Sequence, residues 1–126
     1  MINKVILLGY VGKDPEMATS QNVNLAKFSV ATSESYKDQS GNWREDTEWH
    51  SIVAWRNLAD YCAKHIKKGM LVYIEGKIIN RQWTDTNNVI RYNTDIKAST
   101  IRIAERREKP VQVSGSPIPN DGDLPF

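Results

Sequence analysis

The chain has 126 residues, which is enough for one domain with a single modest core. Its apolar fraction of 40% and its charged fraction of 25% are ordinary for a globular protein. No apolar run in the sequence approaches the roughly 20 residues that cross a bilayer, and the first residues lack the layout of a signal peptide. The lone cysteine, Cys62, excludes an internal disulfide and a cysteine-based metal cluster. We therefore expect a cytoplasmic protein.

The net charge of +2 hides an asymmetry along the chain. All 17 lysines and arginines lie at or before Lys109, and residues 1–110 hold 13 of the 15 acidic residues, a balance of +4. The last 16 residues carry Asp121, Asp123 and the terminal carboxylate. A mildly basic body with an acidic tip favours a polyanionic ligand and a separate contact of opposite sign. A charge of +4 is also common in small domains that bind no polyanion.

The first 55 residues read as three strands. The β-branched run over residues 3–10 predicts a first strand that bends at its glycines. Residues 13–16 form a turn around Pro15, and a polar loop is expected through residues 19–22. Residues 24–32 predict a second strand, and a long polar hairpin over 33–45 leads to a third strand over 46–55.

The third strand organises the chain because it carries two tryptophans on one face. Side chains alternate along a strand, so Trp49 and Trp55 point the same way. Residues 57–68 then have helical spacing, with Asn57 as the expected N-cap and Gly69 as the stop signal. Alternation returns over residues 71–83, and a turn at 85–88 leads to a fifth strand over 89–104.

Three strands, one helix and two strands follow one another in the order of an OB-fold. The expected fold class is therefore all-β: a five-stranded Greek-key barrel with one helix between strands three and four. The expected domain covers residues 1–106. From there the composition is polar and proline-rich, which predicts a disordered C-terminal tail, with a short flexible linker over 107–120 and an acidic tip over 121–126.

The sequence gives little support to catalysis. The two histidines, His50 and His65, have no motif around them, and Cys62 lies on the apolar stripe of the expected helix, where a cysteine is usually a core residue. The sequence also lacks a phosphate-binding glycine loop and a carboxylate pair at an informative spacing. We predict that the protein is not an enzyme.

Nucleic-acid binding fits the aromatic and basic residues better. Single strands are bound by aromatic rings on which bases stack, at about 1–3 kcal/mol per base, together with cations that follow the phosphates. Trp49, Trp55 and Trp83 lie on expected strands, Lys77 and Arg81 share the face of Trp83, and Arg56 follows Trp55. The alternative is that the tryptophans are core residues flanked by solvated charges. Lys4, Lys27 and Lys97 are each better interpreted as ordinary surface lysines.

The order and spacing of several short motifs resemble the bacterial single-stranded DNA-binding protein family. These motifs cover residues 3–104 and the C-terminus: NKVILLG (3–9), GKDPE (12–16), ATSES (31–35), TEWH (47–50), KG (68–69), VYIEG (72–76), WTD (83–85) and DGDLPF (121–126). The resemblance implies an OB-fold homotetramer that coats single-stranded DNA without strong sequence preference. It also implies no cofactor, a cytoplasmic, nucleoid-associated location, and roles in replication, recombination and repair.

The resemblance also implies roles for individual residues. His50 falls at a position that the family places near a subunit contact. The tip is expected to recruit replication and repair proteins through Asp121, Asp123, Leu124, Pro125 and Phe126. The expected DNA-binding residues combine the family's positions with our own reading of the aromatic and basic residues: Tyr36, Trp43, Arg44, Trp49, Trp55, Arg56, Lys68, Lys77, Arg81 and Trp83.

The chain departs from the family pattern in several places. Tyr36 replaces the usual tryptophan and Trp55 the usual phenylalanine, while Trp43 is an additional aromatic residue and Asn57 replaces a commonly basic one. The linker is much shorter than is typical of the family, which puts highly cooperative DNA binding in doubt. Two rival functions remain open: an OB-fold adaptor of a primosome or conjugation complex, and an RNA chaperone that uses the same stacking chemistry.

Overall fold

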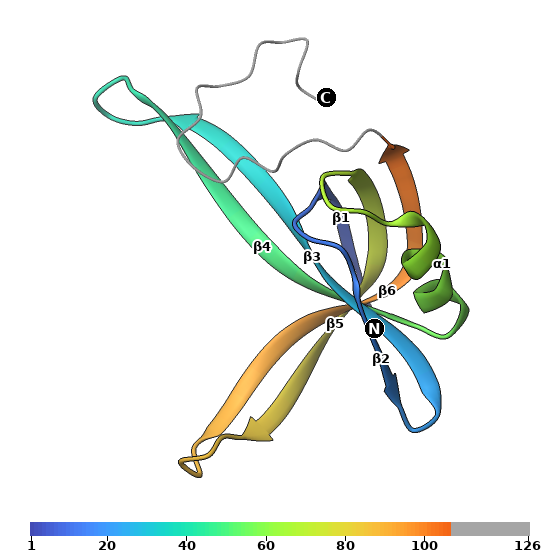
Figure 1. Cartoon of the computed structure of the whole chain (residues 1–126). Coiled ribbons are helices and arrows are strands. Elements are labelled where there is room, and N and C mark those ends of the chain that lie inside the picture. Colours follow the sequence, from blue (N-terminus) through green and yellow to red (C-terminus); the bar gives the residue numbers. More distant parts are fainter. Residues whose placement is uncertain (107–126) are drawn as a thin grey trace.

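The computed structural model describes residues 1–106, which form six strands and one helix (Figure 1). The expected linker and acidic tip lie outside the described residues. No helix within the described range is long and apolar enough to span a membrane. The elements, in chain order, are β1 (Val5–Val11), β2 (Glu16–Ser20), β3 (Val23–Lys37), β4 (Trp43–Trp55), α1 (Asn57–His65), β5 (Leu71–Thr84) and β6 (Ile90–Glu105).

The strands form one sheet that closes on itself. The strand order is β1-β5-β6-β4-β3-β2, and β1 pairs again with β3 where Tyr10 lies opposite Ala31. All pairings are antiparallel except β4 with β6, where Ile52 lies beside Ile96 in a parallel arrangement. Gly9 permits the close approach of β1 to β3, since a Cβ there would lie 2.2 Å from the Ala31 carbonyl oxygen. This closure gives the small barrel expected of an OB-fold.

The core lies inside the barrel and under the helix. One face of each long strand supplies fully buried β-branched residues, including Val30, Ile52 and Ile74. Helix α1 packs against β3 and β4 and buries Ala59 and Cys62. Burial raises the pKa of the Cys62 thiol to about 12, so it stays protonated and unreactive at neutral pH. The interpretation of Cys62 as a core residue is confirmed.

Strand β2 is an element that the sequence pattern did not reveal, since a loop was expected at residues 19–22. All five of its residues are exposed, so it has no buried apolar face for an alternating sequence pattern to mark. It forms because its backbone pairs with β3, with Met17 opposite Ala26, at the edge of the sheet. The structure therefore has six strands where five were expected, and the helix still precedes the last two.

The start of the helix also differs from the expectation. The N-cap residue is Arg56, and its side chain makes no capping hydrogen bond, so the prediction of Asn57 as the cap was wrong. Arg56 has φ 59° and ψ −125°, a backbone conformation that costs a residue with a side chain of the order of 1–3 kcal/mol. The helix ends at His65, three residues earlier than expected, because Ile66 returns to an extended conformation and is buried in the core.

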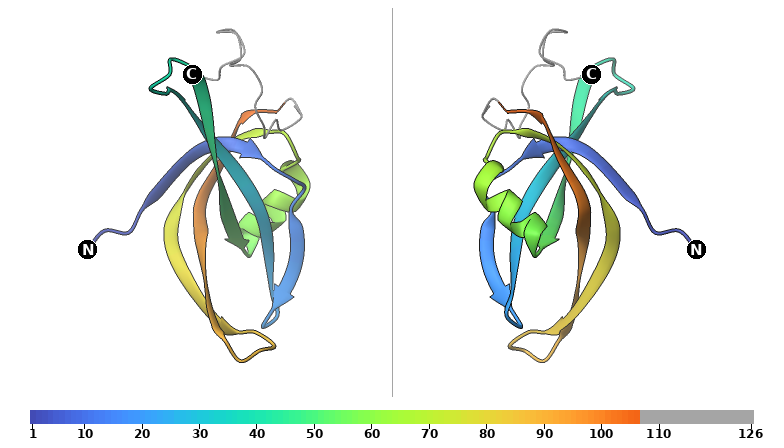
Figure 2. Two further views of the ribbon diagram at one scale, coloured as in Figure 1. Left: turned by 90° about the vertical axis from the view of Figure 1, so that its left-hand side faces the viewer. Right: turned by 90° about the vertical axis from the view of Figure 1, so that its right-hand side faces the viewer.

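Two long hairpins, β3–β4 and β5–β6, project from the barrel body (Figures 1 and 2). Their turns are built in the same way. In the first, Asp38 accepts hydrogen bonds from the backbone N–H groups of Ser40 and Asn42 and from Nε of Arg44. In the second, Asp85 accepts from the N–H groups of Asn87 and Val89 and from Nε of Arg91. Local carboxylate bonds thus stabilise both turns where little core reaches them.

Candidate nucleic-acid interface

Three tryptophans follow one another along one face of β4. Trp43, Trp49 and Trp55 are six residues apart, and an even spacing places side chains on the same face of a strand. Neighbouring rings are attached about 20 Å apart along the strand, at roughly 3.3 Å per residue. The opposite face carries Ile52 and Ala54, which are fully buried. The tryptophans therefore lie on the outer face of the barrel, away from the core.

Trp49 is 43% exposed and its ring packs against Gly12. A Cβ at Gly12 would lie 2.4 Å from Cζ3 of Trp49, so glycine is required there for the ring to keep this position. The backbone at Gly12 is fixed in turn, since its N–H donates to the Ser29 carbonyl oxygen at 2.9 Å. The residue that follows β1 thus forms the support on which the Trp49 ring lies.

Trp55 is only partly exposed and has two polar features. The Lys97 ammonium lies 5.8 Å from the centroid of its ring, in cation–π range. Its indole Nε1 is buried and has no acceptor among residues 1–106.

Trp83 lies on the β5–β6 hairpin and is 45% exposed. With the Asn93 amide turned to satisfy both of its neighbours, the indole Nε1 of Trp83 donates to the Asn93 side-chain oxygen at 3.2 Å. Lys77, Arg81 and Trp83 share one face of β5, as the spacing predicts. Nε of Arg81 donates to Oδ2 of Asp95, whose side chain is almost fully buried.

The strand pairing places three lysines in one row across this outer face. Lys27 lies opposite Val53, Val53 lies beside Lys97, and Lys97 lies opposite Lys77. With strands about 4.8 Å apart, the row crosses β3, β4, β6 and β5 within roughly 15 Å. Val53 is buried although it lies on the outer face, between Lys27 on one side and Lys97 on the other.

The three lysines were not recognised together from the sequence. The sequence pattern selects Lys77 as a DNA-binding residue and favours Lys27 and Lys97 as ordinary surface lysines. They lie 70 residues apart in the chain, and only the parallel pairing of β4 with β6 reveals that they flank the same residue. Gly12 was also missed as the support of Trp49. No local sequence signal identifies either feature.

The tip of the β3–β4 hairpin splits its candidate residues between two faces. Tyr36 lies opposite Arg44, and Lys37 lies opposite Trp43. Alternation places Tyr36 and Arg44 on the face that carries the core residues further down the hairpin, and Trp43 on the face of Trp49. Trp43 is 60% exposed, and Arg44 is paired with Asp38. Tyr36 is therefore not part of the same aromatic row.

The remaining candidate cations lie at the ends of α1. Arg56 precedes the helix, directly after Trp55. Lys68 lies in the segment between α1 and β5, where its backbone N–H donates to Oδ1 of Asp14 at 2.8 Å. This bond attaches the segment to the turn after β1, close in sequence to Gly12. Arg56 and Lys68 are both exposed.

His50 lies outside this outer face. It is half-buried on the core side of β4, where Nε2 is 2.8 Å from Oγ1 of Thr32. Within the described range, no group of three or more histidine, cysteine, aspartate or glutamate side chains is arranged to hold a metal ion.

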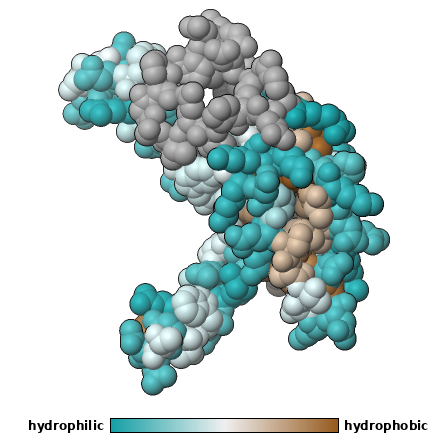
Figure 3. All heavy atoms as spheres, in the orientation of Figure 1, coloured by the Kyte–Doolittle hydropathy of each residue, from teal (hydrophilic) through white to brown (hydrophobic). Residues whose placement is uncertain are grey.

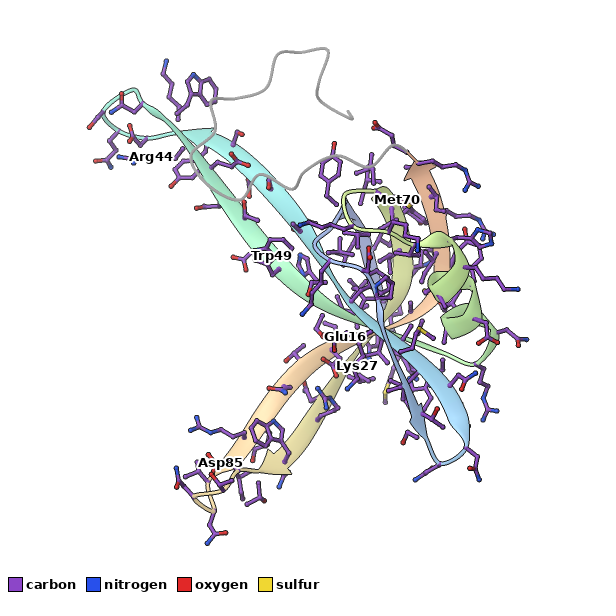
Figure 4. The ribbon with its side chains drawn as sticks, in the orientation of Figure 1. Glu16, Lys27, Arg44, Trp49, Met70 and Asp85 are labelled. Atoms are coloured by element: carbon purple, nitrogen blue, oxygen red, sulfur yellow. The ribbon has the colours of Figure 1, made fainter. Side chains whose placement is uncertain are left out.

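Figures 3 and 4 show where the polar and aromatic residues lie relative to the barrel body. In Figure 3 the projecting hairpins are mainly hydrophilic or pale, and apolar residues gather over the barrel body. Figure 4 shows Trp49 on β4 between Arg44, towards one hairpin tip, and Lys27, where the strands cross, with Asp85 at the tip of the other hairpin. The site is thus an open surface of aromatic rings and cations, which suits an extended ligand.

Comparison with known proteins supplies the family. The model of the single-strand binding protein family matches residues 2–104. Single-stranded DNA-binding protein 1 of Chlorobaculum tepidum is 45% identical over 104 residues, which are 81% of this chain and 64% of that protein. The chain therefore spans less than two thirds of the length of this relative.

A solved structure shows a similar fold. The structure described as a Plasmodium falciparum SSB complex with ssDNA superposes with a TM-score of 0.75 at 31% identity. The match covers 83% of this chain and 96% of that one. The fold, the family match over residues 2–104 and the identity to the bacterial relative agree, and the chain belongs to the single-strand binding protein family.

Proposed function

We propose that this protein binds and coats single-stranded DNA, without strong sequence preference and without catalysing a reaction. The observation that carries the proposal is the outer face of the sheet, where Trp49, Trp55 and Trp83 lie with a row of three lysines and Arg81. A relative named for binding single-stranded DNA, and a similar fold solved in complex with ssDNA, support the choice of ligand.

The chemistry follows from the two kinds of residue. Every base has a flat face, so stacking on exposed tryptophan rings binds bases of any sequence, at about 1–3 kcal/mol per base. The cations contact phosphates and release counterions, so the logarithm of affinity should fall with the logarithm of salt concentration by about 0.7 per phosphate contacted. Bound DNA is thereby protected during replication, recombination and repair.

The proposed DNA-binding residues fall into a central group and a peripheral group. The central group is Trp49, Trp55, Trp83, Lys77 and Arg81, on one face of the sheet. The peripheral group lies at the hairpin tip and at the ends of the helix and consists of Tyr36, Trp43, Arg44, Arg56 and Lys68. The peripheral residues extend the path of a strand that wraps around the barrel.

We also propose that the protein forms a homotetramer. Strand β1 pairs along one edge with β5, but within residues 1–106 its other edge pairs with β3 only at Tyr10 and Val11. A second chain could pair with the rest of that edge. Next to this edge, Ile6 and Leu8 are exposed, beside a cluster in which Tyr73 and Lys4 contact Glu75. An open edge and an apolar face supply the two interfaces of a symmetric tetramer. His50 remains a proposed interface residue.

Partner recruitment is proposed for residues 121–126, on the basis of their sequence. Asp121 and Asp123 supply negative charge, and Leu124, Pro125 and Phe126 supply an apolar end. A partner protein would bind them in an apolar pocket beside a basic residue. Deletion of residues 121–126 should abolish recruitment of replication and repair proteins and leave DNA binding intact or tighter.

The DNA-binding proposal is tested by titrating the protein with a poly-dT oligonucleotide and following tryptophan fluorescence. Stacking predicts strong quenching that saturates at a fixed number of nucleotides per protomer. Double-stranded DNA of the same length serves as the control and should quench weakly. Unquenched fluorescence with no detectable complex would reject the proposal.

A further inference from the structure

A cavity of about 280 Å³ lies beside Trp55, between the β2–β3 and β5–β6 hairpins. Thr19 and Ser20 of the edge strand β2 form one wall, Trp55 and Lys27 belong to the middle of the sheet, and Arg81 and Asp95 form the opposite wall. Its volume is near the lower end of the range for small-ligand sites, about 300 Å³, so it suits a single base better than a larger molecule.

Asp95 is the unusual residue in this cavity. It is only 2% exposed, and it is the one charged residue buried among residues 1–106. An ionised carboxylate has about four acceptor positions, and the hydrogen bonds that the structure shows to Asp95 amount to one, from Nε of Arg81 to Oδ2. Burying a charge is costly unless it is paired, so a carboxylate with spare acceptor capacity at a cavity wall is suited to a ligand that donates hydrogen bonds.

The surroundings make this carboxylate compatible with DNA. Arg81 neutralises Asp95 directly, Lys27 lines the same cavity, and Lys97 lies over the ring of Trp55. A base stacked on Trp55 would therefore have cations available for the phosphates on either side of it. Asp95 belongs to the lining of the cavity, and the charged lining residues, Lys27, Arg81 and Asp95, together keep a positive charge there.

We propose that this cavity is a base-selective subsite, which prefers a base with an amino group on its Watson–Crick edge over thymine. The proposal rests on the binding of single-stranded DNA proposed above. Cytosine presents an amino group that donates to a carboxylate. Thymine presents its single N–H between two carbonyl oxygens, which a carboxylate repels. The other stacking positions remain tolerant of sequence, so the preference belongs to one subsite of the path.

The experiment compares affinities for oligo-dC and oligo-dT of equal length, for the wild-type protein and for Asp95→Asn. In a homopolymer the same base occupies the cavity in every binding register. Because the dC-to-dT affinity ratio of the variant is compared with that of the wild type, differences in flexibility between the two strands cancel. Asparagine still accepts from Arg81 but offers thymine an N–H donor. One charge-assisted hydrogen bond predicts that the dC-to-dT affinity ratio falls by about tenfold in Asp95→Asn.

The matched control is Asp85→Asn, which changes the other aspartate–arginine pair of the same hairpin, outside the cavity. Its dC-to-dT ratio should equal that of the wild type. A second measurement needs no variant: wild-type protein should bind oligo-dC less tightly when the cytosine amino group is dimethylated, and 5-methylcytosine, with added bulk elsewhere, should have no such effect.

The outcomes separate this inference from the proposed function. An unchanged dC-to-dT ratio in Asp95→Asn, or equal affinity for the dimethylated and unmodified strands, would overturn the base-selective subsite while DNA binding stands. If neither homopolymer binds the wild-type protein, the proposed function itself fails.

Discussion

The β3–β4 and β5–β6 hairpins have the same turn and opposite charge. Each begins its turn with an aspartate that binds two backbone N–H groups and an arginine six residues later. Residues 33–47 nevertheless contain four carboxylates and two cations, a net charge of −2, whereas residues 77–97 contain four cations and two carboxylates, a net charge of +2. Only the second hairpin is electrostatically suited to phosphates.

This difference in charge predicts that the two hairpins contribute unequally to DNA binding. The acidic hairpin exposes Trp43 and Tyr36, but its charge repels phosphates, so we expect its aromatic residues to contribute little to DNA binding. The basic hairpin brings Trp83, Arg81 and Lys77 to the lysine row that crosses the barrel. The main DNA path should therefore run from β4 across the lysines to β5–β6, with the β3–β4 tip as an extension.

The largest expected effect comes from removing rings on this path. Trp49→Ala combined with Trp83→Ala should weaken binding of oligo-dT by about 1–3 kcal/mol for each base that loses its stacking partner. Trp43→Ala, on the acidic hairpin, is the matched control and should cost less than Trp83→Ala alone or the double variant. Fluorescence anisotropy of a labelled oligonucleotide measures all three. Equal losses for Trp43 and Trp83 would remove the distinction between the hairpins.

The next largest effect is expected at Gly12. Gly12→Ala places a Cβ where the Trp49 ring lies, so the ring must move or the end of β1 must shift. Affinity should fall by up to the value of one stacked base, about 1–3 kcal/mol. Adding Trp49→Ala should then cause little further loss, which a double-mutant cycle detects. Fully additive losses would show that Gly12 does not act through Trp49.

Neutralising single lysines tests whether the basic β5–β6 hairpin binds the phosphates. Lys77→Gln and Lys97→Gln should each reduce the slope of log affinity against log salt by about 0.7, because each removes one phosphate contact. Lys37→Gln, on the acidic hairpin opposite Trp43, should change the slope less. The slopes come from titrations at several salt concentrations. A larger change in the salt slope for Lys37→Gln than for the other two variants would place the phosphates on the β3–β4 hairpin and contradict this prediction.

Arg56 should show opposite effects on stability and binding. Arg56→Gly relieves its left-handed backbone conformation and should raise the free energy of unfolding by about 1 kcal/mol. It also removes a cation next to Trp55, so the salt slope should fall by about 0.7. Denaturant unfolding and salt titrations measure the two quantities. Greater stability with unchanged binding would remove Arg56 from the DNA-binding residues.

The smallest expected effect is the response of the two turns to acid. The Arg44 guanidinium and the Asn42 N–H lower the pKa of Asp38, and the Val89 N–H and Arg91 lower the pKa of Asp85. A lowered folded-state pKa means that this stabilisation is present above the unfolded value of about 3.9 and is lost as pH falls through the folded values. Backbone NMR shifts of Asn42 and Val89 should therefore move in both hairpins only below pH about 4.

The sequence predicted the elements that have strong alternation. The shared face of Trp49 and Trp55, and that of Lys77, Arg81 and Trp83, follow from a period of two within one strand. The exposed strand β2 lacks that period, and the polar flanks of the β3–β4 turn concealed how far its strands extend. The alternation of residues within a strand shows which side chains share a face. It does not show which strands pair with one another.

The candidate DNA-binding surface likewise depends on strand pairing that the sequence pattern does not show. The lysine row depends on the parallel pairing of Val53 with Lys97, and the support of Trp49 depends on β1 passing beneath it. The family resemblance places Tyr36 among the stacking residues together with the tryptophans, whereas the register places it on the opposite face from Trp43. Each of these features is set by pairing between strands that are distant in sequence.

The measurement that tests the central claim most directly is the quenching of tryptophan fluorescence by oligo-dT in the wild type and in Trp43→Phe, at low and high salt. If the outer face of the barrel is the main DNA path, quenching should saturate and weaken with salt, and it should persist almost fully in Trp43→Phe. Quenching that disappears in Trp43→Phe would place the DNA on the acidic hairpin and contradict this account.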